Sequence, residues 1–181
     1  MALKRTENRE DSRVELHLHT KMSDRDALVN VKELLQTVKA WGHPAVAITD
    51  HGVIQAFPEA QEVAGKLGVK VIYGVEGYLI EDEENDTRAH IILLAKNRVG
   101  LRNLYKMISI SHLQYYKRRP RLPRAVIEDH REGIIIGSAC EAGELIRAII
   151  KGESQERLLE IASFYDYLEI QPLENNQFFN V

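Results

Sequence analysis

The sequence predicts an α/β fold in which a largely parallel sheet is covered by helices. Short apolar runs, such as 45–49 and 134–138, alternate along the chain with segments of helical periodicity, such as 30–41 and 100–116. The 181 residues, 44% of them hydrophobic, are enough for one domain with a sizeable core.

The chain begins its regular structure at 14–20, where apolar and polar residues alternate and predict a strand with His17 and His19 on one face. Asn30 and Glu33 form a capping pair that predicts the start of the first helix. Further strands are expected over 45–49, 69–73, 75–80 (after a turn at Gly74), 90–95, 134–138 and 167–170. Further helices are expected over 55–67, 100–116, 142–151 and 154–164, and a short helix is expected to end at about 129.

Composition limits the class of protein. A net charge of −3 gives no general attraction to nucleic acid or anionic membranes, so any nucleic-acid contact must be local. The single Cys140 excludes an internal disulfide framework and fits a reducing compartment. Neither a signal peptide nor a membrane span is found, and we expect a cytoplasmic protein. We expect a polar arm at 1–12, one domain at 13–172 with an acidic solvated connection at 81–88, and an irregular tail at 173–181.

Polar side chains recur where the predicted strands end, and the carboxyl ends of parallel strands form one rim of a sheet. Two histidines on a strand could equally face solvent without a ligand, and a cysteine after an apolar strand is often a buried small hydrophobe. Repetition at one rim favours a metal site over these alternatives. The residues at the expected rim are His17, His19, Asp50, His51, Glu76 and Cys140.

The ordered motifs His17-Leu18-His19-Thr20, Asp26, 48–52 and 74–76 resemble the PHP (polymerase and histidinol phosphatase) family. Stretches 41–45, 100–106, 119–124, 137–140 and 162–169 make the chain most similar to the PHP domains of PolC-type bacterial replicative DNA polymerases. The resemblance covers about 13–172. It implies a distorted (β/α)7 TIM-like barrel with up to three metal ions at the carboxyl rim.

The resemblance also implies site residues. Asp50 would orient His51 by accepting its other ring proton. His17, His19 and Glu76 would act in catalysis through the bound metal. The implied metal ligands are His17, His19, Asp26, His51, Glu76, His90 and Cys140. Imidazoles, carboxylates and one thiolate suit Zn²⁺ first, with Mn²⁺ or Fe²⁺ at the carboxylate-rich positions.

Two departures from the family pattern change the expectation. PolC-type chains carry an exonuclease inserted where only 81–88 stands here. The last family motif, Asp-x-His, has no counterpart before Val181. We therefore expect one intact metal position (Glu76, His90 and Cys140), two weakened ones, and a barrel without its closing strand. Such an open edge invites association between copies of the chain.

A dense basic cluster follows the long helix, and its default interpretation is a solvated loop. Contact with a DNA phosphate backbone is the alternative. Its residues are Lys117, Arg118, Arg119, Arg121 and Arg124.

Three functions fit these expectations. The first is a metal-dependent phosphoesterase, with 3′–5′ exonuclease or pyrophosphatase chemistry, in a DNA polymerase whose other domains are its partners; its activity would be weak in this chain. The second is a non-catalytic, metal-braced docking module of the polymerase. The third is a free-standing histidinol-phosphatase-like enzyme.

Overall fold

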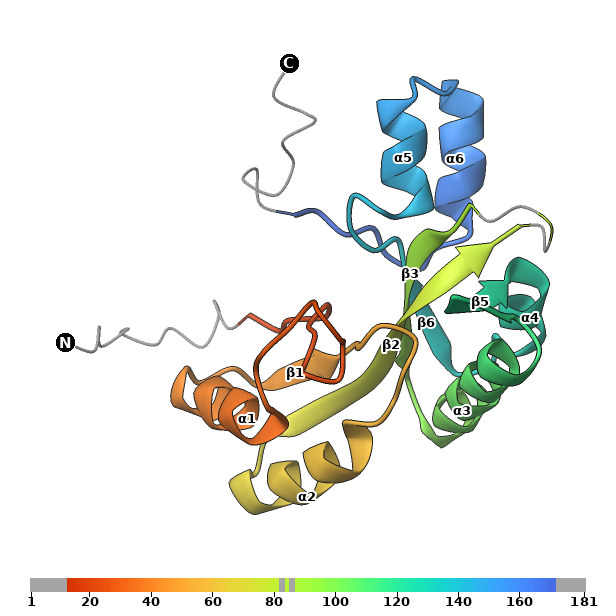
Figure 1. Ribbon diagram of the computed structural model, residues 1–181. Coiled ribbons are helices and arrows are strands. Elements are labelled where there is room, and N and C mark those ends of the chain that lie inside the picture. Colours follow the sequence, from red (N-terminus) through yellow and green to blue (C-terminus); the bar gives the residue numbers. More distant parts are fainter. Residues whose placement is uncertain (1–12, 82–83, 85–86, 172–181) are drawn as a thin grey trace.

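A mixed six-stranded sheet forms the centre of the computed structural model, which describes residues 13–81, 84 and 87–171 (Figure 1). The order is β4-β5-β2-β3-β6, and β1 also pairs with β2. The strands are β1 (Ala45–Ile48), β2 (Lys70–Ile80), β3 (Ala89–Ala95), β4 (Tyr116–Lys117), β5 (Arg119–Pro123) and β6 (Ile134–Gly137). The predicted arm and tail lie outside the described residues, as do residues 82–83 and 85–86 of the predicted connection.

The prediction of a largely parallel sheet is wrong. β2 runs parallel to β1 and to β5 but antiparallel to β3, and β3 runs antiparallel to β6. The link between β2 and β3 is too short to hold a crossover helix, and a parallel pair requires one. The chain therefore turns back directly.

Six helices surround this sheet in the described part of the chain. In Figure 1, α1 and α2 lie together beside β1 and the first half of β2, α3 and α4 lie near β5 and β6, and α5 packs beside α6. The helices are α1 (Val31–Ala40), α2 (Phe57–Leu67), α3 (Arg98–Leu113), α4 (Arg124–Asp129), α5 (Glu144–Ile150) and α6 (Gln155–Ser163). None of these described helices has the length and apolar character needed to cross a membrane.

α1 forms as its sequence predicts. The Asn30 side chain accepts a hydrogen bond from the backbone nitrogen of Glu33 at 2.9 Å, which satisfies an otherwise unpaired donor of the first turn. Leu35 and Val38 are buried against α2 and β1. Trp41, the last residue of the predicted helical segment 30–41, is exposed because the helix has already ended.

β2 is one continuous strand, so the turn predicted at Gly74 is wrong. Gly74 pairs directly with Leu94 in the β2–β3 ladder. A Cβ atom at this position would lie 2.5 Å from Leu94 Cδ2 and 2.9 Å from the carbonyl oxygen of Leu93. The glycine therefore permits close packing against β3 and does not mark a turn.

The first and last predicted strands are reduced to extended segments. The 14–20 segment makes one parallel bridge, between Glu15 and Val46, and the 167–170 segment makes one, between Gly137 and Tyr167. Leu16 and Leu18 pack in different apolar clusters, so the predicted single apolar face does not form. The sheet is open, and barrel closure is not seen within the described residues.

The basic cluster is not a solvated loop. It forms β4, the hairpin turn at Arg118, β5 and the start of α4, and β5 joins the sheet beside β2. Leu122 of this stretch is fully buried in the largest apolar cluster. That burial explains why the segment becomes a strand despite its charge.

Candidate metal centre

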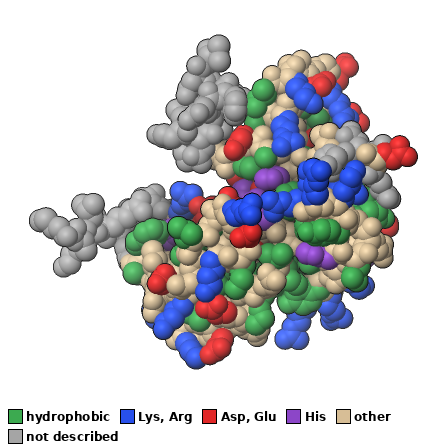
Figure 2. Space-filling view, viewed as in Figure 1, with side chains coloured by type: hydrophobic (Ala, Val, Ile, Leu, Met, Phe, Trp, Pro, Cys, Tyr) green, Lys and Arg blue, Asp and Glu red, His purple; other side chains and the backbone are tan. Residues whose placement is uncertain are grey.

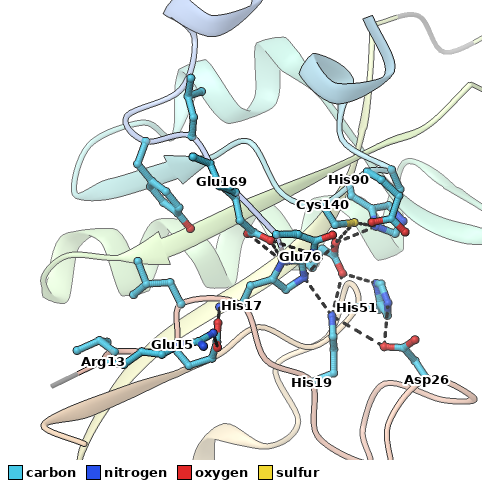
Figure 3. A pocket seen from close by; sticks show the side chains of 18 residues that line it. Arg13, Glu15, His17, His19, Asp26, His51, Glu76, His90, Cys140 and Glu169 are labelled. Atoms are coloured by element: carbon cyan, nitrogen blue, oxygen red, sulfur yellow. Dashed lines mark hydrogen bonds and ion pairs between the residues drawn. The ribbon is translucent and has the colours of Figure 1, made fainter. Parts of the chain in front are cut away.

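Glu76, in the middle of β2, is the central residue of the site. Only 1% of its side chain is exposed, and four imidazoles surround its carboxylate (Figure 3). Oε1 lies 3.3 Å from His17 Nε2 and 2.8 Å from His90 Nδ1, while Oε2 lies 3.1 Å from His19 Nε2 and 2.9 Å from His51 Nδ1. A carboxylate this deeply buried is stable only where its charge is compensated.

Three separate parts of the fold supply these histidines. His17 and His19 stand on the extended segment beside β1, and His51 follows β1 in a bridge to Glu76. His90 stands at the amino end of β3. Because β3 runs antiparallel to both β2 and β6, its amino end lies at the same rim as the carboxyl ends of these two neighbours.

Asp26 and Cys140 complete the set of seven candidate ligands. Asp26 Oδ2 lies 3.4 Å from His51 Nε2 and 3.9 Å from His19 Nε2. Cys140 Sγ lies 3.6 Å from His90 Nδ1 and 3.8 Å from Glu76 Oε1. Two neighbouring ligand atoms on one tetrahedral Zn²⁺ ion are about 3.3–3.6 Å apart, so the spacing suits a shared ion.

Three triads of side chains are close enough to share an ion in the described chain. Each offers ligand atoms within 4.8 Å of one another. They are His17 with His19 and Glu76, His19 with Asp26 and His51, and His51 with Glu76 and His90. Cys140 adjoins the third triad.

His17 is oriented by a residue that the sequence did not indicate. Glu169 places both carboxylate oxygens at 2.9 and 3.0 Å from His17 Nδ1. The backbone nitrogen of Glu169 in turn donates to Ser138 Oγ at 2.9 Å. Nδ1 therefore donates to Glu169, and Nε2 of a neutral ring points its lone pair toward Glu76.

His19 is oriented through a chain of hydrogen bonds from Asp50. Ser23 Oγ donates its proton to Asp50 Oδ1 at 2.8 Å and lies 3.1 Å from His19 Nδ1. Because that hydroxyl proton is already used, His19 Nδ1 must be the donor, and Nε2 is left with a free lone pair.

Asp50 does not hold the His51 ring, contrary to what the resemblance implied. Among the described residues, its carboxylate accepts from the backbone and hydroxyl of Thr20 and from Ser23. Asp50 and His51 are consecutive residues in extended backbone, which directs their side chains to opposite sides. Asp50 thus fixes the loop after His19.

His51 Nδ1 fits a metal ligand for a different reason. It is buried and makes no hydrogen bond to any residue that the structure describes, although it lies 2.9 Å from Glu76 Oε2. Buried polar nitrogens are rarely left without a partner. Together with the spacing of the donor atoms, this unpaired atom supports the fit of a divalent cation among these residues.

Charge coupling shifts three groups of the site. Burial alone would raise the pKa of Glu76, but the histidines around it hold that pKa far below its usual range. Burial opposes the charge on His17, yet hydrogen bonds to Glu169 and Glu76 prevail and raise its pKa to about 10. Burial, followed by the charge of Glu76, raises the pKa of Cys140 to about 12.

A tight turn after β6 presents Cys140. Ala139 adopts φ 58°, which is uncommon for a residue with a side chain, and Gly143 donates from its backbone nitrogen to the Cys140 carbonyl at 2.8 Å. A Cβ atom at Gly143 would lie 2.2 Å from the Ser138 carbonyl oxygen. A residue in such an uncommon conformation persists only where the surrounding contacts fix it, so this turn also fixes the position of the Cys140 thiol.

The predicted basic residues do not act as one group. Arg121 is buried and donates from Nε to the Tyr115 carbonyl oxygen. Arg124 pairs with Glu81 and Glu144. Of the five cations, Arg119 alone is among the described residues that line a pocket beside the site.

The centre opens into a cavity of about 770 Å³, large enough for a substrate. All seven candidate ligands and Glu169 line it. The open arrangement permits access to the ion positions from solvent.

The chain matches the PHP domain model over residues 15–172 and belongs to this family. Within it, the chain is similar to DNA polymerase III PolC-type of Clostridium perfringens, at 27% identity over 376 aligned positions that include 97% of this chain and 26% of the relative. The alignment is about twice as long as the 181 residues here, so the relative contains long segments that this chain lacks. The chain thus spans about a quarter of the length of this relative.

A second relative shows a stronger local match. DNA polymerase III PolC-type of Bacillus subtilis is 52% identical over 85 residues, 47% of this chain and 6% of the relative. A solved structure assigned as a metal-dependent phosphoesterase from Bifidobacterium adolescentis superposes with a TM-score of 0.58 at 16% identity, covering 93% of this chain and 82% of that one. That likeness shows a PHP-like fold.

Proposed function

We propose that this chain is the PHP domain of a bacterial replicative DNA polymerase and that it binds divalent metal ions and hydrolyses phosphoesters, with 3′–5′ exonuclease or pyrophosphatase chemistry. One observation carries the proposal. The buried Glu76 carboxylate lies within 3.3 Å of four imidazole nitrogens. Such a cluster of ligand atoms around one buried carboxylate is what a multinuclear metal site requires.

The donor set favours Zn²⁺, with Mn²⁺ or Fe²⁺ where carboxylates dominate. Glu76 would bridge the ions, His17 and His19 would hold one position, Asp26 and His51 a second, and His90 with Cys140 a third. Bound divalent ions supply Lewis acidity, which acidifies water and neutralises charge on the phosphate oxygens.

The protein's own contribution is orientation. Glu169 and Ser23 fix the tautomers of His17 and His19, so that both Nε2 atoms face the same point. Glu169 itself binds the far nitrogen of His17, so it does not replace the carboxylate that the family motif would add to this position. Preorganised ligands bind a metal without reordering side chains.

A structural role is the second candidate, and one observation favours it. The candidate ligands come from the segment beside β1, from β2, from β3 and from the turn after β6. A bound ion would therefore tie together parts of the open sheet and stabilise a docking surface for other polymerase domains. The PolC relatives favour either role over a free-standing histidinol phosphatase.

Metal analysis combined with a hydrolysis assay on a 3′-labelled oligonucleotide distinguishes the two roles. We expect stoichiometric zinc and chelator-sensitive release of the 3′ nucleotide, lost in His17→Ala. His43→Ala is the matched control, because His43 lies outside the candidate metal centre and contacts Trp41.

Bound zinc and a zinc-dependent rise in melting temperature without hydrolysis would support the structural role and contradict the catalytic one. A chain that takes up no divalent metal would contradict both.

A further inference from the structure

A second pocket, of about 510 Å³, opens beside the metal centre and shares two of its walls, His51 and His90. Its lining is basic, and none of the described residues that line it is acidic. Its other lining residues are Tyr78, Thr87, Arg88, Arg119 and Arg147. The metal-centre cavity, by contrast, is lined by several carboxylates.

Three separate elements supply the arginines. Arg88 precedes β3, Arg119 begins β5 and Arg147 lies on α5. The guanidinium of Arg119 lies over the Tyr78 ring at 5.7 Å from its centroid, and Arg147 Nη1 donates to the carbonyl oxygen of Arg88. These contacts hold the side chains of Arg119 and Arg147 at the pocket wall.

Tyr78 links the two pockets. Its ring stacks on His51, with centroids 5.8 Å apart, and meets the edge of His90 at 5.5 Å. The same ring thus contacts two candidate metal ligands and the Arg119 guanidinium. Figure 2 shows histidine side chains at the middle of this face with Lys and Arg side chains next to them.

We propose that this arginine pocket, formed by Arg88, Arg119 and Arg147, binds a phosphate of a nucleic-acid strand next to the phosphate that the metal centre hydrolyses. The inference rests on the proposed function and names its substrate class. Guanidinium groups bind phosphate oxygens through paired hydrogen bonds and keep their charge at all physiological pH values. A phosphodiester strand supplies a further phosphate at each nucleotide, whereas a phosphomonoester supplies only the one that the metal centre would hold.

The pocket explains which part of the basic cluster faces substrate. Arg119 does so, while the neighbouring Arg121 and Arg124 are engaged within the fold. The pocket adds Arg88 and Arg147, which are remote from Arg119 in sequence. Binding through phosphates alone gives no preference for base sequence.

Fluorescence anisotropy of the full chain with labelled oligothymidylate, without metal and over a range of salt concentrations, tests the pocket directly. We expect Arg119→Ala, whose native side chain is exposed, to weaken binding, and Arg119→Ala with Arg147→Ala to weaken it about tenfold. The slope of log K against log salt should fall by about 0.7 for each phosphate that the variant no longer binds. The control is Arg102→Ala with Lys106→Ala, two exposed cations of α3 outside the pocket, which should bind within about twofold of the parent chain.

Unchanged affinity and slope in both arginine variants would overturn the proposal. So would competition by thymidine triphosphate that is as strong, per molecule, as that of the oligonucleotide, because the pocket would then serve a nucleoside polyphosphate.

Catalysis gives an independent readout. With metal, Arg119→Ala should lower kcat/KM for the oligonucleotide about tenfold and leave hydrolysis of bis(p-nitrophenyl) phosphate, which has no second phosphate, within about twofold. Equal losses on both substrates would overturn the proposal. A chain that hydrolyses neither substrate contradicts the proposed function, and anisotropy then still decides whether the pocket binds the strand.

Discussion

Single hydrogen bonds decide which nitrogen of each paired histidine faces Glu76. His17 and His19 both donate from Nδ1, to Glu169 and Ser23, and their Nε2 atoms lie 3.2 Å apart. With both rings neutral, two lone pairs at that distance would repel each other; protonation of His17, whose pKa is raised to about 10, removes this repulsion in the metal-free chain, and a bound cation would do so in its place. If the centre binds metal as proposed, the hydrogen-bonding partners of these rings contribute to its affinity by fixing the tautomers.

Glu169→Ala should weaken the binding of divalent metal about 10–100-fold, because His17 loses the partner that fixes its tautomer. Glu169→Gln should restore part of the affinity, since the amide oxygen still accepts from Nδ1. Isothermal titration with Zn²⁺ measures both variants, and Glu153→Ala is the control for loss of one exposed acid. Equal affinities in all three would show that Glu169 does not orient His17.

The raised pKa of His17 predicts a pH dependence of stability in the metal-free chain. The folded value of about 10 exceeds the ordinary 6.5, so protonated His17 stabilises the fold fully below pH 6.5, and this contribution is lost as pH rises to about 10. Urea unfolding across this range should show stability falling in the metal-free parent chain and a shallower fall in His17→Gln. If the free energy of unfolding fell equally steeply with pH in the parent chain and in His17→Gln, the dependence would belong to a group other than His17.

The resemblance to the PHP family implied the seven candidate ligands, and the structure brings all of them to one cavity. Ser23 escaped prediction because its role depends on Asp50, 27 positions away, which takes the hydroxyl proton, and Glu169 escaped it because its contact is also long-range. Glu169 lies 152 positions from His17. For Glu169, the only signal in the sequence was the alternation at 167–170, which sets Tyr167 and Glu169 on one face.

At the scale of elements, helices followed their sequence signals better than strands did. Caps such as Asn30 and Asn97 act within three residues, so they are visible in the sequence. Strand direction and pairing depend on partners elsewhere in the chain. The basic segment 119–123 became a strand because β2 offered it an edge and Leu122 could be buried.

Gly74→Ala tests the interpretation of β2 as a continuous strand that packs closely against β3. The added methyl group would meet both Leu94 and the Leu93 carbonyl oxygen, and we expect unfolding free energy to fall by about 1–3 kcal/mol. Gly65→Ala is the matched control, because nothing lies within 4 Å of a Cβ atom there and the residue is inside α2. That variant should gain up to about 1 kcal/mol. If chemical denaturation showed the same change in unfolding free energy for Gly74→Ala and Gly65→Ala, the interpretation that Gly74 permits close packing would be contradicted.

At the scale of the molecule, the metal centre lies across the open side of the sheet. The segment beside β1 carries His17, the segment beside β6 carries Glu169, and the hydrogen bond between these side chains joins the two borders. Each border segment makes only one bridge to its neighbouring strand. The side chains of the candidate metal centre therefore connect the two borders, although the sheet itself stays open among the described residues.

The open border also predicts association between copies of the chain, as expected from the sequence for an unclosed sheet. Leu168 and Ile170 stand on the border segment with 51% and 94% of their surface exposed, and an extended segment with one bridge offers unpaired backbone groups to a second chain. Light scattering should show a mass that rises with concentration above that of one chain. Leu168→Lys with Ile170→Lys should return the chain to a monomer, because charged side chains on an edge oppose pairing. Leu159→Lys, an exposed leucine on α6 away from this border, is the control and should leave association unchanged. A parent chain that is monomeric at all concentrations would show that the border segments cover the sheet edges sufficiently by themselves.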